Sequence, residues 1–197
     1  MDDRFDLHFS KRAKEMRASD VRELLKLLQK PDMISFAGGL PNPETFPVDI
    51  IRDIVNDVLK GGGKALQYGI TEGYMPLRES LAERMRGKGM DVSTENVITV
   101  SGSQQVIDLM GKVFIDPGDV VVVSAPTYLT ALTGFAIYSP VFESVPIDDH
   151  NMRMDLLEEK LKQLGRESRR PKTVYALPNF QNPAGVTMPE KSRRRLV

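Results

Sequence analysis

The chain has 197 residues, 41% of them hydrophobic, with Lys+Arg and Asp+Glu numbering 27 each, a balance that argues against nucleic acid as the main partner. Disulfides and thiolate metal sites are excluded because cysteine is absent, and His8 and His150 are too far apart in sequence to suggest a metal site. No apolar run reaches the ~18 residues of a membrane span, and the charged N-terminus lacks a signal-peptide core, so we expect a cytoplasmic protein without a membrane segment.

The first part of the chain alternates predicted helices with loops rich in glycine and proline. An apolar stripe predicts a helix over residues 20–30, and Arg22 lies beside that stripe. The following loop contains Gly38 and Gly39, which permit a close approach of another group to the backbone, although a plain loop is the simpler interpretation. Further helices are expected over residues 48–60 and 76–86, each ended by glycine.

The most informative stretch is a predicted strand, tight turn and helix near the middle of the chain. Residues 97–100 are apolar and mostly β-branched, and residues 103–114 have helical periodicity. The N–H groups of Gly102, Ser103 and Gln104 would then point outward at a helix N-terminus, where they favour an anion such as phosphate. A helix cap without a ligand is the alternative. The patterns of a triphosphate-binding loop and of a dinucleotide fingerprint are both absent.

The rest of the chain alternates predicted strands and helices. Strands are expected over residues 120–123, 141–145 and 173–177, with Pro146 ending the second. Thr127 is expected to cap the helix that follows the first of these strands. The pattern predicts an α/β fold whose mostly parallel sheet has helices on both faces, with ligands at the carboxyl ends of the strands. The loops at those ends are residues 101–104, 126–128 and 179–185, and together they suit a flat, phosphorylated aromatic ligand.

Six short motifs carry a family resemblance. They are Ser35-Phe-Ala-Gly-Gly-Leu-Pro41, Leu66-Gln-Tyr-Gly69, Thr71-Glu-Gly-Tyr74, Ser101-Gly-Ser-Gln-Gln105, Ala125-Pro-Thr-Tyr128 and Pro178-Asn-Phe-Gln-Asn-Pro-Ala-Gly185. In order and spacing they resemble the class I/II, fold-type I aminotransferases that depend on pyridoxal 5′-phosphate, especially the 2-aminoadipate, kynurenine and aromatic amino-acid subgroup. The resemblance implies an incomplete cofactor-binding large domain over residues 35–197. It also implies an N-terminal arm and substrate-side helix over residues 1–34, belonging to the small domain.

The resemblance also implies roles for individual residues around the cofactor. The turn formed by Gly102, Ser103 and Gln104 would hold the phosphate, and the Tyr128 ring would stack on the pyridine ring. Asn182 would donate to the 3-hydroxyl oxygen, and the peptide bond between Asn182 and Pro183 is a candidate cis bond.

Three more residues have implied roles outside the cofactor pocket. Tyr68 would reach the cofactor phosphate of a neighbouring subunit, which implies a homodimer. Gly39 would lie beside the substrate carboxylate, and Arg22 would meet an acidic substrate side chain.

Several parts that the family needs are missing from this sequence. The lysine that forms a Schiff base with the cofactor, an Asp in an Asp-x-x-Tyr context and a late arginine for the substrate carboxylate are expected beyond Val197. We therefore interpret the chain as the N-terminal half of an enzyme that transfers an amino group from an amino acid to a 2-oxo acid, inactive by itself. A non-catalytic fragment is one alternative. The effector domain of a cofactor-binding transcriptional regulator is another, disfavoured because residues 1–18 contain no helix-turn-helix.

Overall fold

The computed structural model describes residues 7–15 and 41–197. The chain divides into two compact units, one formed by Met1–Met16 with Val100–Val197 and the other by Arg17–Thr99. In the described ranges, no helix combines the length and the apolar character needed to cross a membrane.

Some of the sequence-based expectations lie outside these residues. The predicted helix over residues 20–30, with Arg22, is among them, and so is Gly39. The predicted domain boundary between residues 34 and 35 also lies there and stays a prediction.

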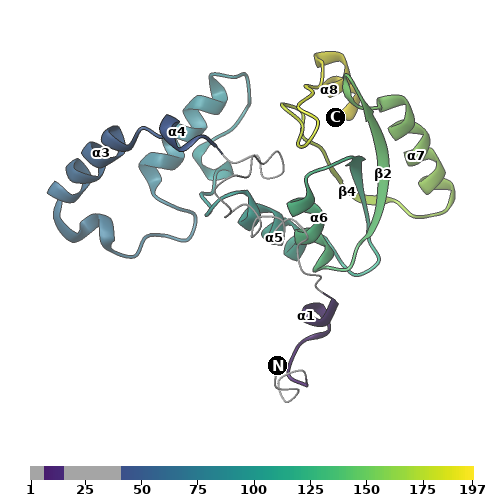
Figure 1. The fold of residues 1–197 in the computed structure, drawn as a ribbon, viewed down its shortest axis with the longest axis horizontal. Helices are drawn as coiled ribbons and strands as arrows, with labels where there is room; N and C mark the ends of the chain where they lie inside the picture. Colours follow the sequence, from purple (N-terminus) through teal and green to yellow (C-terminus); the bar gives the residue numbers. More distant parts are fainter. Residues whose placement is uncertain (1–6, 16–40) are drawn as a thin grey trace, which may run out of the picture. The chain divides into compact units, whose positions relative to one another are not determined.

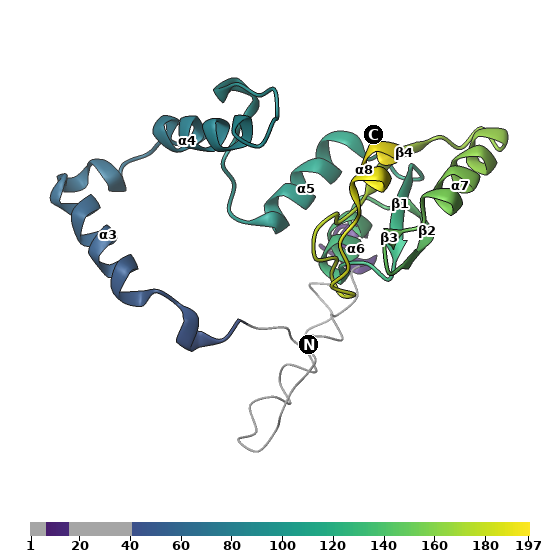
Figure 2. The same ribbon diagram turned by 90° about the horizontal axis from the view of Figure 1, so that it is seen from above.

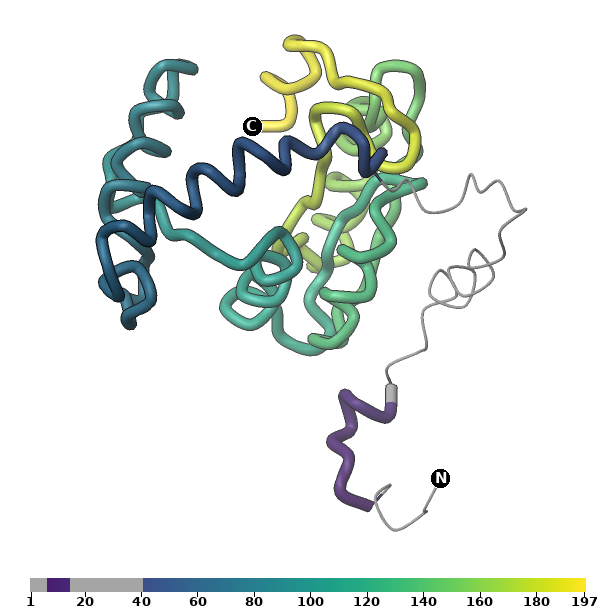
Figure 3. The backbone as a smooth tube through the Cα atoms, turned by 60° about the vertical axis from the view of Figure 1, so that its left-hand side comes forward, coloured from purple at the N-terminus to yellow at the C-terminus, as the bar shows by residue number. Residues whose placement is uncertain are grey.

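The unit Arg17–Thr99 contains helices α3 (Val48–Lys60) and α4 (Met75–Arg86), connected by residues 61–74 (Figure 3). Short 3-10 turns lie at Pro43–Thr45, Gly62–Leu66 and Thr94–Asn96. Both α-helices agree with the predicted ones. A glycine follows each of them. Pro76 lies in the first turn of α4, where backbone N–H groups have no acceptor within the helix, so its lack of an N–H costs no helical hydrogen bond.

The prediction of a strand over residues 97–100 is wrong. This segment is not part of any sheet in the described structure. Its backbone groups bond elsewhere: the buried Arg78 side chain donates to the Val97 carbonyl at 2.7 Å, and the Thr99 N–H donates to the Glu72 carbonyl at 2.9 Å. An extended backbone becomes a strand only when another strand lies beside it, and apolar β-branched residues do not guarantee such a neighbour.

The unit with Val100–Val197 is built on a four-stranded sheet. Its strands are β1 (Val120–Ala125), β2 (Val141–Asp148), β3 (Asn151–Met152) and β4 (Pro171–Tyr175), in the order β3-β2-β1-β4. β1 is parallel to β2 and to β4, whereas the short β3 is antiparallel to β2. The predicted mostly parallel sheet is therefore confirmed, and β3 is an addition that the sequence pattern did not indicate.

Helices cover both faces of this sheet (Figures 1 and 2). They are α5 (Ser103–Phe114) and α6 (Leu129–Ala136) on one face and α7 (Met154–Arg166) and α8 (Glu190–Leu196) on the other. A short helix, α1 (Lys11–Glu15), lies near the N-terminus of the chain. The three-layer α/β arrangement predicted from the alternation of strands and helices is confirmed.

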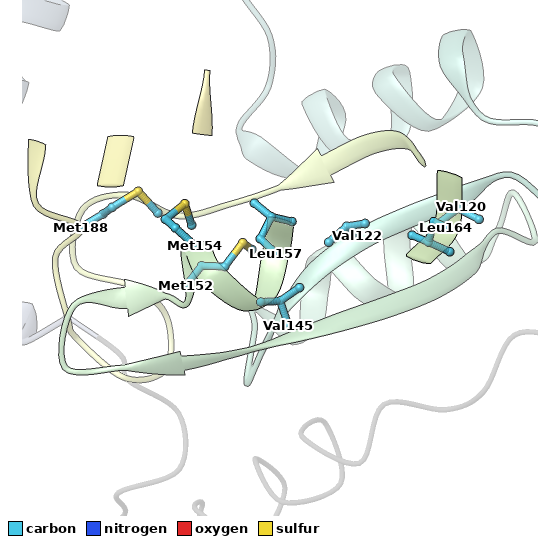
Figure 4. Close-up of a cluster of buried hydrophobic side chains, with 8 residues drawn as sticks. All are labelled: Val120, Val122, Val145, Met152, Met154, Leu157, Leu164 and Met188. Atoms are coloured by element: carbon cyan, nitrogen blue, oxygen red, sulfur yellow. The ribbon is translucent and has the colours of Figure 1, made fainter. Parts of the chain in front are cut away.

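The central strand β1 has its side chains buried on both faces. Val120 and Val122 belong to the cluster under α7, which Figure 4 shows together with Leu157 and Leu164. Val121 belongs to the cluster under α5 and α6. Successive side chains of a strand point to opposite faces, so a run of four valines is what a strand with helices on both sides requires.

Pro146 does not end β2, as the sequence suggested, because the strand continues to Asp148. The Pro146 carbonyl accepts a hydrogen bond of 3.0 Å from the Arg153 N–H, which follows β3. β3 and β1 lie on opposite sides of β2, and the C=O and nitrogen of one strand residue point to the same side, so the Pro146 nitrogen faces away from β1. The N–H that proline lacks is therefore not needed for the pairing with β1, and the proline is tolerated inside the strand.

Candidate functional site

Gly102 makes the turn into α5 with a left-handed backbone conformation. Its φ is 79°, and no heavy atom lies within 4 Å of the position that a Cβ would occupy. Glycine adopts this conformation without steric cost, which leaves the entrance to α5 open. The Gly102 N–H donates to the Val100 carbonyl at 3.0 Å, so it does not point outward as expected. Among the described residues, the N–H groups of Ser103 and Gln104 remain as the free donors of the predicted three.

The Gln104 side chain lies against α6. An added Cβ at Gly134 would be 3.1 Å from Gln104 Nε2 and 2.6 Å from Ile107 Cγ2, so the two helices meet here with no room for a side chain. Tyr128 occupies the N-cap position of α6. The contact between α5 and α6 at Gly134 lies in the second half of α6, whereas Tyr128 precedes the first residue of that helix.

Tyr128 follows the end of β1, where its ring is partly buried against the cluster under α5 and α6. Tyr175, at the end of β4, packs edge-on against Phe135 with 5.9 Å between ring centroids. Burial raises the pKa of Tyr175, and the neighbouring Tyr128 raises it further. Tyr128, after β1, and Tyr175, at the end of β4, therefore pack against the same cluster under α5 and α6.

The expectation that Thr127 caps α6 is wrong. The N-cap position is one residue later, and among the described residues no side-chain hydrogen bond caps this helix. The Thr127 hydroxyl oxygen is buried instead, without a hydrogen-bond partner in the described part of the chain. A buried hydroxyl without a partner is costly, so this oxygen is available to a polar group that binds beside Tyr128.

The loop after β4 carries Asn182 on an exposed tip. The peptide bond between Asn182 and Pro183 is cis, as the resemblance implied, and the bond between Ala125 and Pro126 is also cis, which was not predicted. Gln181, immediately before Asn182, is fully buried and donates to the Pro126 carbonyl at 2.8 Å. The loop of Asn182 is therefore bonded directly to the loop of Tyr128.

Two further side chains form hydrogen bonds to the segments on either side of Asn182. Asn151 donates to the Leu177 carbonyl at 2.8 Å, and Arg193 of α8 donates to the Met188 carbonyl at 2.7 Å and to Asn179 Oδ1 at 2.6 Å. Sequence analysis gave no role to Asn151, Arg193 or Gln181, although Gln181 stands inside the motif Pro178–Gly185. A lone polar residue in a loop or helix gives no signal of a distant backbone acceptor.

The structure thus bonds the loop of Tyr128 to the loop of Asn182 at the carboxyl ends of β1 and β4, and α5, which begins after Gly102, belongs to the same unit. The loops offer backbone N–H donors at a helix N-terminus, an aromatic ring, a buried unpaired hydroxyl and an exposed amide. These groups fit an anionic group, a flat ring and a ring oxygen. In the described ranges no group of three or more His, Asp or Glu side chains is placed to hold a metal ion.

Comparison with known proteins decides the family. Residues 32–197 match the model of the aminotransferases of class I and II. The chain belongs to this family.

Aminotransferases are also its close relatives. It is 55% identical over 195 residues to aromatic-amino-acid aminotransferase 1 of Thermococcus litoralis, covering 98% of this chain and 47% of the relative. It is 45% identical over 190 residues to the 2-aminoadipate transaminase of Thermus thermophilus, covering 96% of this chain and 45% of the relative. The chain therefore spans about half the length of these relatives.

Solved aminotransferases share the fold. The kynurenine aminotransferase of Pyrococcus horikoshii, solved in complex with PMP, superposes with a TM-score of 0.90 at 54% identity, over 97% of this chain and 48% of that one. The predicted α/β fold, resembling the large domain of fold-type I aminotransferases, is confirmed by this match.

Tyr68, Gly39 and Arg22 are not among the connected loops. Tyr68 belongs to the unit Arg17–Thr99, where it is 99% exposed and its N–H bonds to the Gln67 side chain at 2.8 Å. Gly39 and Arg22 lie outside the described residues. The roles that the resemblance implies for these three residues stay predictions.

Proposed function

We propose that this chain supplies the cofactor-binding half of a pyridoxal-phosphate-dependent aminotransferase, which transfers an amino group from an amino acid to a 2-oxo acid. The observation that supports it is the direct hydrogen bonding between the loops of Tyr128 and Asn182 at the carboxyl ends of β1 and β4, in a chain of the aminotransferase family. When bound, the cofactor supplies a ring that draws electrons from the substrate.

Each loop has one task in this proposal. The N–H groups of Ser103 and Gln104, with the positive end of α5, bind the phosphate. The Tyr128 ring stacks on the cofactor ring and fixes its plane. The Asn182 side chain donates a hydrogen bond to the ring oxygen and holds negative charge there. The Thr127 hydroxyl gains the partner that it lacks in the described residues.

Substrate choice and assembly belong to the same proposal. Arg22 meets an acidic or long substrate side chain, Gly39 leaves room for the substrate carboxylate, and Tyr68 reaches the phosphate in a second copy of the chain. The names of the relatives support aromatic amino acids, kynurenine and 2-aminoadipate as the amino donors to test first. The homodimer and the cytoplasmic location are part of the proposal.

The chain contains no Ser-x-Ser-Lys and no Asp-x-x-Tyr sequence. We therefore propose that these 197 residues bind the cofactor without catalysing transamination. Pyridoxamine 5′-phosphate is the appropriate probe, because its amine does not react with surface lysines as an aldehyde does.

The test is a titration of the chain with pyridoxamine 5′-phosphate, followed by ligand fluorescence, in parallel with pyridoxamine, which lacks the phosphate. We expect saturable binding that requires the phosphate. Gly102→Ala should weaken it, because alanine is strained at a φ of 79° and the turn must change. Gly118→Ala is the matched control: its φ is 90°, it also has open space around the Cβ position, and it lies in another turn.

Equal binding of the two ligands would contradict the phosphate site. So would equal loss of affinity in the two glycine variants, because backbone strain alone would then explain the effect.

A further inference from the structure

Gln181 is a fully buried amide whose hydrogen-bonding groups all have partners. Its Nε2 donates to the Pro126 carbonyl at 2.8 Å and to Ser124 Oγ at 3.3 Å, and its Oε1 accepts from the Ala184 N–H at 2.9 Å. Both N–H bonds and the carbonyl oxygen are therefore used inside the protein. A buried side chain with this pattern fixes its surroundings, because losing any one bond leaves a polar group without a partner.

These bonds join two parts of the chain that meet only in the folded protein. Pro126 lies two residues before Tyr128, and Ala184 lies two residues after Asn182. The Gln181 amide nitrogen bonds to Pro126, more than 50 residues earlier in the sequence, and its oxygen bonds to Ala184 within the same loop. Its backbone N–H also bonds to the Val186 carbonyl at 2.8 Å, which closes the base of the loop.

We propose that Gln181 is a positioning residue that sets the spacing between the Tyr128 ring and the Asn182 amide, and so the width of the slot for a flat, phosphorylated heteroaromatic ligand. This inference rests on the proposed function. Gln181 does not touch the ligand itself; it acts through the two loops that do.

The chemistry of the side chain makes the proposal specific. Both acceptors of Nε2 lie on the Tyr128 side, whereas the donor to Oε1 lies on the Asn182 side. A carboxylate at this position keeps the bond from Ala184 but places negative charge against the Pro126 carbonyl. A neutral carboxyl group restores one O–H donor. Gln181→Glu should therefore depend on pH, and Gln181→Met, of similar length and without donors, should not.

The groups around the side chain do not supply this pH dependence. Its direct partners are neutral, and the titratable or charged side chains on the adjoining segments are Tyr128, Tyr175 and Arg193 and, beside Asn151, Asp148, Asp149, His150 and Arg153. All of these groups are present in Gln181→Met as well, so a pH dependence seen only in Gln181→Glu comes from the new carboxyl group. Burial raises the pKa of a carboxyl group, so the new glutamate should change charge within or near the range from about pH 5 to about pH 8.

The experiment compares the 197-residue chain with its Gln181→Met and Gln181→Glu variants in two measurements. The first follows the amide ¹H–¹⁵N resonances of Tyr128 and Asn182 without ligand. The second is the dissociation constant of pyridoxamine 5′-phosphate between about pH 5 and pH 8. Gln163→Glu is the control, because Gln163 is exposed on α7 and bonds to Glu167, away from both loops and from every residue assigned to the ligand.

We expect Gln181→Met to shift both resonances at every pH and to weaken binding at least tenfold. Gln181→Glu should do the same at about pH 8 and return toward the starting protein at about pH 5, while Gln163→Glu stays unchanged. The reversal within one sample separates positioning from a general folding defect.

Unmoved Tyr128 and Asn182 resonances in both variants would overturn the proposal, and so would shifted resonances with undiminished binding. If the starting chain itself shows no ligand response, the proposed function fails. The resonances measured without ligand then still decide whether Gln181 determines the spacing between the loops of Tyr128 and Asn182.

Discussion

Replacing Gly134 by alanine tests how closely α5 and α6 pack beneath the candidate phosphate loop. The new Cβ would lie 2.6 Å from Ile107 Cγ2 and 3.1 Å from Gln104 Nε2. Ile107 is only 5% exposed and is β-branched, so its Cγ2 cannot rotate away without disturbing the core. The substitution therefore forces the two helices apart or displaces Ile107.

Two opposing effects set the magnitude. Alanine favours a helix over glycine by about 1 kcal/mol, whereas overpacking a core costs about 1–3 kcal/mol. A carbon–carbon contact of 2.6 Å must lengthen by about 1 Å to become favourable, which puts the cost near the upper end of that range. We expect a net loss of about 1–2 kcal/mol, which lowers the melting temperature of a chain of this length by about 2–8 °C.

The assay is thermal and urea unfolding followed by near-ultraviolet circular dichroism. Gly165→Ala in α7 is the control, since no heavy atom lies within 4 Å of its Cβ position and alanine should leave stability unchanged or raise it. In an Ile107→Ala background the clash is removed, so Gly134→Ala should become neutral or stabilising. An unchanged melting temperature for Gly134→Ala, or the same cost with and without the Ile107 side chain, would refute this account.

Three other substitutions have defined outcomes. The hydrogen bond from Lys160 at 3.1 Å lowers the pKa of Glu143 below its usual 4.5. The ionised Glu143 thus stabilises the fold above about pH 4.5, and this stabilisation is lost as the pH falls through the folded-state pKa. The free energy of urea unfolding should therefore be larger for the starting chain than for Glu143→Gln at neutral pH, and the two should become equal toward about pH 3. A difference in free energy that stays constant with pH would contradict this. Leu164→Ala should cost about 2–5 kcal/mol in the same assay, because Leu164 is fully buried; a loss under about 1 kcal/mol would show that the cluster under α7 collapses around the gap. Arg193→Ala should accelerate amide hydrogen exchange over residues 178–188 and not in β1, whereas uniform acceleration would indicate global destabilisation.

Local sequence signals predicted most of the fold because they depend on near neighbours. The four valines of β1 indicated burial on both faces, and the glycines after α3 and α4 marked where those helices end. The segment 97–100 is rich in β-branched residues, as β1 is, and forms no strand here, because pairing depends on a neighbour that composition does not specify.

The site was predictable in its parts but not in its connections. Tyr128 and Asn182 stand in motifs that sequence reasoning finds. Gln181, which joins their loops, bonds to Pro126 across 55 positions, and only the folded chain brings these residues together. The N-terminal arm shows the same limit: Arg12 lies 5.7 Å from the centroid of the Tyr138 ring, a contact that no periodicity near Arg12 suggests.

The order of the strands has a practical consequence for handling the protein. β4 is the last strand in the sheet, and its side away from β1 bonds to no other strand among the described residues. Such a row of unpaired N–H and C=O groups can recruit an extended segment from another molecule. Concentrated solutions of the 197-residue chain should therefore be prone to intermolecular β-pairing, and a charged residue or proline introduced on that border is the rational way to keep samples monodisperse.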